Sequence, residues 1–205
     1  MMTMPIRVAA KPITFPTLST VTVDPARLLR VSSRDTGEPY FGKTGRNRFD
    51  DPNPDPAARY GTCYFGTSLA VAVAETLLHD RTPVQGFFVI EPAVISSRFV
   101  IQFKGSPIIL ADLTGAGLRR LGGHGGLTGT SYYKTPQKWS LEIYNHPGLV
   151  DGFLYMSRHK NDEKAIVLFD RASCKLHMKV AARLTAHPEF GQTATNLFIR
   201  SSYEK

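Results

Sequence analysis

Cysteine is almost absent from this chain, and long apolar runs are absent altogether. The two cysteines, Cys63 and Cys174, cannot form a disulfide framework or a four-cysteine zinc site, so the chain suits a reducing compartment. No stretch approaches the ~18 apolar residues of a membrane-spanning helix, and the N-terminal residues lack the apolar core of a secretory signal. We therefore expect a cytoplasmic protein with no membrane partner.

The residue patterns of metal sites, phosphate loops and cysteine nucleophiles are missing as well. The six histidines form no His-x-x-x-His pair, and none stands at ligand spacing from a cysteine, so we predict no metal. The glycine-rich segment 122–130 does not fit Gly-x-Gly-x-x-Gly from Gly123, because Thr128 occupies the last position, and we interpret it as a surface loop. Cys63 precedes an apolar helical segment and is predicted to be a buried thiol.

The composition is that of one globular domain. Hydrophobic residues make up 42% of the 205 residues, which is enough to build a core, and charged residues make up 20%, a value typical of globular proteins. The net charge of +8 would attract anions such as nucleotides or nucleic acid. A basic nucleic-acid-binding module is therefore an alternative, but no helix-turn-helix, zinc finger or aromatic-basic strand motif accompanies the charge. We expect no direct nucleic-acid binding.

Helices and strands are predicted in a mixed order. Residues 1–24 contain three prolines and suit an extended arm, and 33–60 suit a long loop. Strands are predicted at 27–32, 62–65, 86–90, 98–103, 108–110, 152–156, 165–169 and 174–184, and helices at 68–79, 113–121 and 136–145, the last capped by Thr135. This order favours an α+β fold, a single domain with a mixed or antiparallel sheet core and flanking helices. The main domain is expected at 25–185, before a weakly structured C-terminal extension at 186–205.

One carboxylate, Glu75, lies inside an almost wholly apolar helical segment. Ser68 is the expected N-cap of this helix. The predicted core stripe comprises Leu69, Ala72, Val73, Thr76 and Leu77. Glu75 lies off this stripe, at the rim between core and surface. Because an unpartnered buried carboxylate is unstable, either an ion pair with an arginine or a cleft must accommodate Glu75.

Four segments carry the candidate site residues. They are Arg48 in the long loop, Tyr64 at the end of a strand, Glu75 in the helix, and Ser157-Arg158 after a later strand. Tyr64 precedes Glu75 by eleven residues, and the turn between them folds the helix back over the strand, which is compatible with one shared cleft. The structural alternatives are a core ring for Tyr64, an ion pair with Asp50 or Asp51 for Arg48, and a turn start for Ser157.

These segments, in this order, resemble the RES domain family, which is named for its Arg, Glu and Ser. The matching motifs are Leu28-Leu29-Arg30-Val31, Asn47-Arg48-Phe49-Asp50, Tyr64 to Ser68 followed by Glu75-Thr76-Leu77, and Asp151-Gly152-Phe153-Leu154-Tyr155-Met156-Ser157-Arg158. The resemblance covers residues 28–170. It departs locally, because Asn47 replaces a common Gly, Asp50 replaces a common Asn, and the Pro- and Asp-rich insert before Tyr64 is longer than usual.

The resemblance implies a fold, an activity and a partner. Known RES proteins are bacterial toxins of toxin-antitoxin pairs, have a fold similar to ADP-ribosyltransferases, and consume NAD. By resemblance, this chain cleaves NAD at the nicotinamide–ribose bond by hydrolysis or phosphorolysis, with protein ADP-ribosylation as the alternative. The implied partner is an Xre-type DNA-binding antitoxin that covers the active site, and either a toxin homodimer or a hetero-oligomer with the antitoxin is compatible with the family.

The residues implied by the family suit this chemistry. The implied catalytic residues are Glu75, Arg48, Tyr64 and Ser157, and the implied NAD-binding residues are Arg30, Arg48, Tyr64, Ser157 and Arg158. A carboxylate stabilises the positive charge that develops on ribose when nicotinamide leaves. Guanidinium groups bind pyrophosphate oxygens, a tyrosine ring stacks on nicotinamide, and a serine hydroxyl orients ribose or phosphate.

Overall fold

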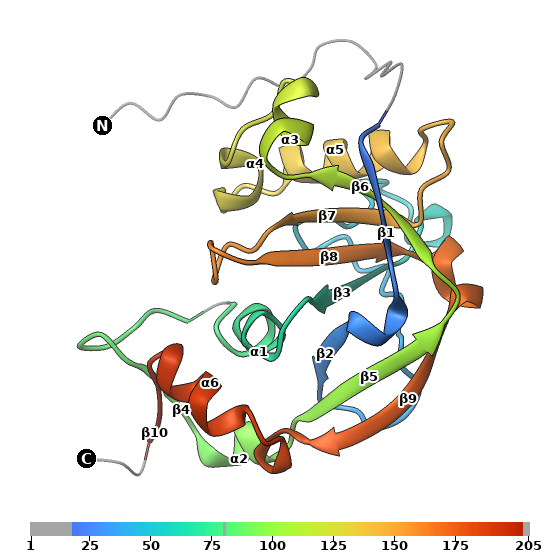
Figure 1. The fold of residues 1–205 in the computed structure, drawn as a ribbon. Coiled ribbons are helices and arrows are strands. Elements are labelled where there is room, and N and C mark those ends of the chain that lie inside the picture. The colour runs from blue at the N-terminus through green and yellow to red at the C-terminus, as the bar shows by residue number, and fades with distance from the viewer. Residues whose placement is uncertain (1–17, 80, 203–205) are drawn as a thin grey trace.

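Eight strands form the main sheet of the computed structural model, which describes residues 18–79 and 81–202 (Figure 1). They are β1 (Thr20–Val23), β2 (Leu29–Ser32), β3 (Thr62–Gly66), β5 (Phe99–Gly105), β6 (Ile108–Leu113), β7 (Gly152–Met156), β8 (Lys164–Phe169) and β9 (Leu176–Arg183). Their order across the sheet is β1-β6-β7-β8-β3-β2-β5-β9. β6 and β7 run parallel and the other neighbours run antiparallel, so the sheet is mixed, as the sequence predicts.

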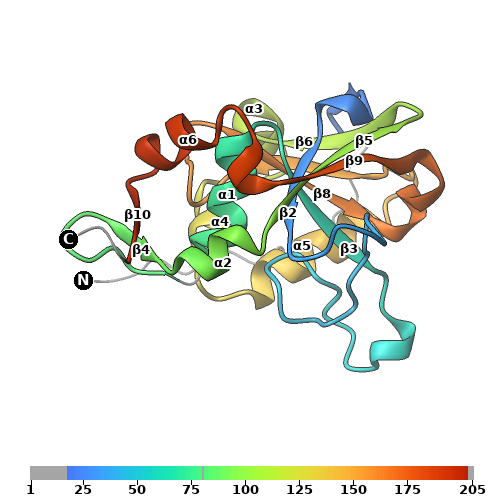
Figure 2. The same cartoon turned by 90° about the horizontal axis from the view of Figure 1, so that it is seen from below.

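The main sheet opens between β2 and β3. These two strands pair only at Leu29 and Gly66, whereas β3 pairs with β8 along its whole length and β2 pairs with β5 along its whole length. β2 therefore leaves β3 after one residue pair, and the two ribbons diverge from there (Figures 1 and 2).

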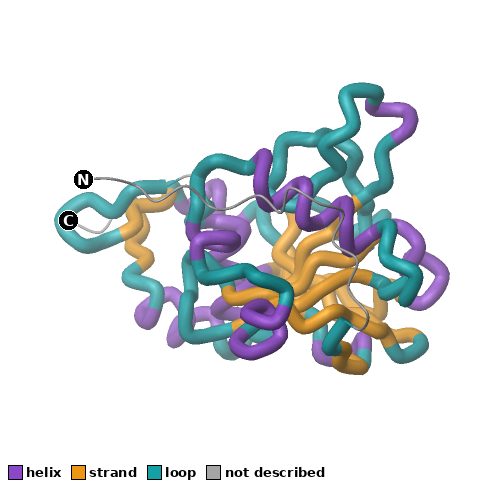
Figure 3. The backbone as a smooth tube through the Cα atoms, turned by 90° about the horizontal axis from the view of Figure 1, so that it is seen from above, coloured by secondary structure: helices purple, strands orange, loops and turns teal. Residues whose placement is uncertain are grey.

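Within the described residues, six α-helices cover the sheet or extend from its edges (Figure 3). They are α1 (Leu69–Leu77), α2 (Pro92–Ser96), α3 (Gly115–Arg120), α4 (Gly126–Gly129), α5 (Lys134–Tyr144) and α6 (Phe190–Asn196), with 3-10 helices at Pro25–Arg27, Pro56–Ala58, Asp170–Lys175 and Leu184–Ala186. α3, α4 and α5 gather beside β6 and β7, while α2 and α6 lie near α1 with the parallel pair β4 (Phe88–Ile90) and β10 (Ile199–Ser201) (Figure 1).

β8 shows how the core is divided between the two faces of the sheet. Val167 and Phe169 belong to a cluster with Trp139 of α5, and the alternate residues Ile166 and Leu168 belong to a cluster on the other face. Because side chains alternate along a strand, β8 is buried on both faces, which accounts for its uninterrupted apolar sequence.

Several sequence predictions are confirmed. The fold is α+β, β7 has the predicted bounds, and Cys63 is a buried thiol whose pKa is raised by burial to about 12. Ser68 caps α1 by accepting a hydrogen bond from the Val71 amide. Glu75 is partly exposed, as expected for a residue at the rim of the core.

Other expectations about local structure were wrong. α5 begins at Lys134, two residues before the predicted start, and Tyr133 rather than Thr135 occupies its N-cap. Leu113 continues β6 instead of opening a helix, and the segment Asp170–Lys175 is a 3-10 helix, so β9 begins two residues later than predicted. Thr76 is exposed instead of joining the core stripe.

Two segments thought to be irregular contain regular structure. Within 122–130, Gly126–Gly129 forms α4, where Leu127 and Thr128 are buried and Leu127 joins the core cluster that contains Trp139 of α5. The last twenty residues contain α6 and β10. At the other end, Thr20–Val23 forms the edge strand β1, while residues 1–17 of the expected arm lie outside the described residues. The division into arm, domain and extension stays a prediction.

In the described part of the chain, no helix is long and apolar enough to cross a membrane.

Candidate active site

A cavity of about 560 Å³ occupies the opening between β2 and β3, with α1 as one wall. Its described lining includes four arginines and one carboxylate: Arg30, Arg48, Arg81, Arg98 and Glu75. Tyr64, Tyr155, Asn47, Thr76 and His79 supply further polar groups, and the remaining lining is mostly apolar. A concave site with a cationic wall and a few convergent polar groups is suited to a negatively charged small molecule.

Glu75 is the carboxylate of this cavity, and two hydroxyl groups bind it. The Ser157 hydroxyl donates to Glu75 Oε1 over 2.6 Å, and Tyr155 also forms a side-chain hydrogen bond with Glu75. Burial and the charge of Glu75 raise the pKa of Tyr155 well above its usual value, so the phenol keeps its proton and acts as the donor. Both donors hold the carboxylate in one orientation.

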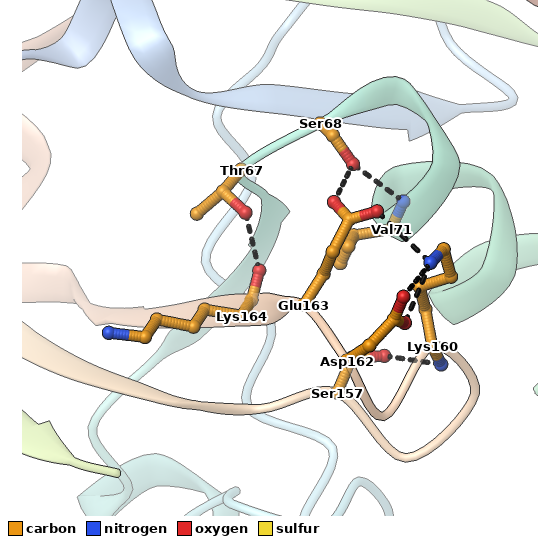
Figure 4. Close-up of polar contacts among 8 residues, drawn as sticks. All are labelled: Thr67, Ser68, Val71, Ser157, Lys160, Asp162, Glu163 and Lys164. Atoms are coloured by element: carbon orange, nitrogen blue, oxygen red, sulfur yellow. Dashed lines mark hydrogen bonds and ion pairs between the residues drawn. The ribbon is translucent and has the colours of Figure 1, made fainter. Parts of the chain in front are cut away.

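The turn between β7 and β8 fixes Ser157 against α1 (Figure 4). Ser157 accepts a hydrogen bond from the Lys160 amide, and Lys160 forms ion pairs with Asp162 and Glu163. Glu163 in turn accepts a 2.6 Å hydrogen bond from the hydroxyl of Ser68, the N-cap of α1. The turn that carries Ser157 is thus tied to the start of the helix that carries Glu75.

Gly66 allows α1 to pack closely on the end of β3. A Cβ atom at this position would lie 2.4 Å from the backbone nitrogen of Ala72, in the first turn of the helix. Because that contact involves backbone, a side chain would push α1 away from the sheet. The Gly-Thr-Ser turn therefore sets the distance between Tyr64 on β3 and Glu75 on α1.

Tyr64 lines the cavity, and its hydroxyl anchors the loop that carries Arg48. The hydroxyl accepts a hydrogen bond from the Phe49 amide at 3.0 Å and lies 3.3 Å from Asp50 Oδ1. Burial and the neighbouring Asp50 charge raise the pKa of Tyr64 well above its usual value. Tyr64 therefore keeps its proton and borders the cavity with an aromatic ring.

Arg48 is buried beside Tyr133 and does not pair with the neighbouring aspartates. It donates to the carbonyl oxygen of Thr130, and its guanidinium lies 4.8 Å from the centre of the Tyr133 ring. Asp50 instead accepts hydrogen bonds from Thr44, Asn47 and Thr62, and Asp51 accepts from the amides of Asn53 and Tyr60. Burial lowers the pKa of Arg48, and the nearby Glu75 charge counteracts part of that effect.

Arg30 and Arg158 occupy different environments. Arg30 lines the cavity, but its guanidinium forms a 2.9 Å ion pair with Glu38 and donates to the Tyr64 carbonyl at 3.0 Å. Arg30 thereby connects β2 and β3 next to Leu29 and Gly66, the one residue pair at which the two strands are hydrogen-bonded. Arg158 is exposed and is not part of the cavity lining. The structure thus brings Arg30, Arg48, Tyr64 and Glu75 to one cavity, adds Ser157 behind Glu75, and leaves Arg158 outside it.

Comparison with protein families identifies the domain. A family model for the RES domain matches residues 24–190. This chain belongs to the RES domain family. A solved structure with a similar fold is a chain in the crystal structure of the M. tuberculosis MbcT-MbcA toxin-antitoxin complex, with a TM-score of 0.55 and 11% sequence identity, covering 80% of this chain and 84% of that chain. No curated protein matches the chain.

Sequence interpretation of this RES domain missed several residues of the cavity. Tyr155 could have been found, because it lies two positions before Ser157 and strand alternation places both on the same face. His79 could also have been found, because it lies four residues after Glu75 and such a spacing places two residues on the same face of a helix. Arg81 and Arg98 reach the cavity only through the tertiary arrangement, so the residues next to them in the sequence do not indicate that they line it.

His159 makes the stability of this RES domain sensitive to pH. Burial, followed by the His79, Arg158 and Arg48 charges, lowers the pKa of His159 below 6.5, although Glu75 opposes the shift. The unfolded chain therefore takes up this proton first as the pH falls, and stability decreases below about pH 6.5. Solvent screening keeps the effect well under the ~1.4 kcal/mol per pH unit that one proton could contribute.

Urea unfolding at several pH values between 5 and 8 would measure this effect. The variant His159→Gln should show a shallower loss of stability at low pH than the parent protein. The exposed His177 provides a matched control, since His177→Gln should keep the parent slope. Equal slopes for His159→Gln and the parent would contradict the assignment.

Proposed function

We propose that this RES protein is the toxin of a toxin-antitoxin pair and cleaves NAD at the nicotinamide–ribose bond. The main support is Glu75, a carboxylate that two hydroxyl groups orient at the wall of a cavity whose described lining also includes four arginines. NAD combines an anionic pyrophosphate with a ribose that becomes positively charged during cleavage. Its two ends therefore match the two kinds of charge in the cavity.

The proposed reaction places Glu75 beside the ribose. The bond between ribose C1′ and the nicotinamide nitrogen breaks, and its electron pair leaves with neutral nicotinamide. Glu75 stabilises the oxocarbenium-like ribose that remains, and Ser157 and Tyr155 keep the carboxylate oxygens in position. An oxygen atom of water, phosphate or a target protein then forms the new bond to C1′ and loses its proton.

The cationic wall supplies substrate binding in this proposal. Arg48 lies within electrostatic reach of Glu75, because the Glu75 charge acts on the pKa of Arg48 and both charges act on the pKa of Tyr155. The Arg48 guanidinium suits a phosphate oxygen. Arg30 contributes less, because Glu38 already neutralises it. Tyr64 lines the cavity, and its ring is suited to stack on nicotinamide.

The proposed partner is an antitoxin protein that blocks this cavity. The structure with a similar fold is described as part of a toxin-antitoxin complex, and the RES resemblance implies an Xre-type DNA-binding antitoxin. We propose that this chain likewise binds an antitoxin, that the antitoxin is an Xre-type DNA-binding protein, and that the toxin acts in the cytoplasm, where NAD would be depleted. A homodimer of the toxin is compatible with such a complex.

Release of nicotinamide from NAD tests the proposed activity. Purified protein should liberate nicotinamide in amounts far above the spontaneous background, without added metal. Repeating the reaction with and without inorganic phosphate, using adenylate-labelled NAD, separates hydrolysis, phosphorolysis and transfer to protein. Unchanged NAD after prolonged incubation at high protein concentration would refute the proposal.

A further inference from the structure

The cavity extends from the Glu75 region toward a second end, where Arg98 lines it. Tyr155 enters from β7, whereas Val94 enters from α2 and Arg98 from the connection between α2 and β5. β7 and β5 are separated in the sheet by β8, β3 and β2, which corresponds to a span of up to about 19 Å at the usual strand spacing. One small ring at Glu75 cannot fill a cavity of this extent.

Arg98 is the residue that defines the second end. Its backbone is fixed, because its amide donates to the Ile95 carbonyl at 3.1 Å and its own carbonyl accepts from the Leu184 amide at 2.9 Å. Its side-chain Nε is buried, yet it has no hydrogen-bond partner within residues 18–79 and 81–202. An unpaired buried donor on a guanidinium is costly, and a bound acceptor would remove that cost.

The described lining offers Arg98 no counter-charge. Glu75 is the one acidic residue among those lining side chains, and Ser157 and Tyr155 already bind it. Arg81 adds a second positive charge to the lining near the end of α1. An anionic ligand would supply the counter-charge that the described lining does not offer these arginines.

We propose that Arg98 forms a phosphate-binding subsite at the end of the cavity opposite Glu75, with Arg81 as a further cation of the lining. The subsite takes a phosphoryl group, whose oxygens match the fork of a guanidinium. In the proposed function this group belongs to the adenylate half of NAD, so the inference rests on that function for its source. Free inorganic phosphate offers the same chemistry and is distinguished by the experiment.

Binding of ADP-ribose to the intact protein tests the subsite without any turnover. Calorimetry should show that Arg98→Gln weakens ADP-ribose binding by about 10- to 100-fold, as expected for loss of a charge-assisted hydrogen-bonded contact. Arg98→Lys retains the charge but not the fork, and should recover part of the affinity. The exposed Arg119 at the end of α3 is the matched control, and Arg119→Gln should bind like the parent protein.

A second titration with inorganic phosphate identifies the source of the phosphoryl group. Weakened binding of ADP-ribose assigns the subsite to the dinucleotide, whereas weakened binding of phosphate alone assigns it to the free anion. Equal affinity of Arg98→Gln and the parent protein for both probes would overturn the proposal. If ADP-ribose binding depends on Arg98 while NAD remains uncleaved, the subsite stands and the proposed reaction fails.

Discussion

Replacing Glu75 with glutamine is expected to lower the rate of nicotinamide release from NAD by about 10²- to 10³-fold or more. Glutamine keeps the size of the side chain but removes the negative charge that would face the ribose in the transition state. The loss should fall mainly on kcat, because the charge on the ribose develops during the reaction and contributes little to ground-state binding.

Steady-state kinetics of Glu75→Gln would measure this loss. Circular dichroism and urea unfolding should show that the variant remains folded, since Glu75 is only partly buried at the edge of α1. Glu189→Gln removes the same charge from an exposed position whose side chain forms no cap hydrogen bond with α6, and should retain full activity. Undiminished turnover in Glu75→Gln would remove Glu75 from the mechanism.

The part of the site formed by neighbouring residues could be predicted from the sequence. Ser68, Gly66 and the apolar helix make a short strand-turn-helix unit, so the placement of Tyr64 and Glu75 on one cavity follows from local rules. The same rules recover β7 within its observed bounds, because alternation and flanking turns define a strand.

The rest of the site depends on contacts between distant segments. The early separation of β2 from β3 creates the cavity, and no local pattern encodes how far two strands stay paired. Arg48 and Thr130 meet across 82 positions, which places the loop of the first next to α4. Local propensity also failed at α6 and β10, since tertiary packing against α1 and β4 decides their structure.

Phe49→Ala should destabilise the protein by about 3–5 kcal/mol, the usual cost of removing a fully buried aromatic side chain. The Phe49 ring is inaccessible to solvent and packs edge-on against Phe153 at 4.9 Å and Tyr155 at 4.8 Å. Its backbone is tied down as well, because its amide donates to Tyr64 and its carbonyl accepts from Ser140 at 2.7 Å. The truncated side chain would leave a void next to Tyr155, which lines the candidate site.

Urea unfolding of Phe49→Ala and Phe198→Ala would separate this effect from the general loss of a phenyl ring. Phe198 is 59% exposed, so its truncation should change the free energy of unfolding by no more than about 0.5 kcal/mol. A cost near 1 kcal/mol for Phe49→Ala would contradict the tight packing described above. Phe49 directly follows Arg48 and contacts Tyr155, which forms a hydrogen bond with Glu75. Loss of the Phe49 ring should therefore also slow the proposed NAD cleavage, because the groups around Glu75 would lose their fixed positions.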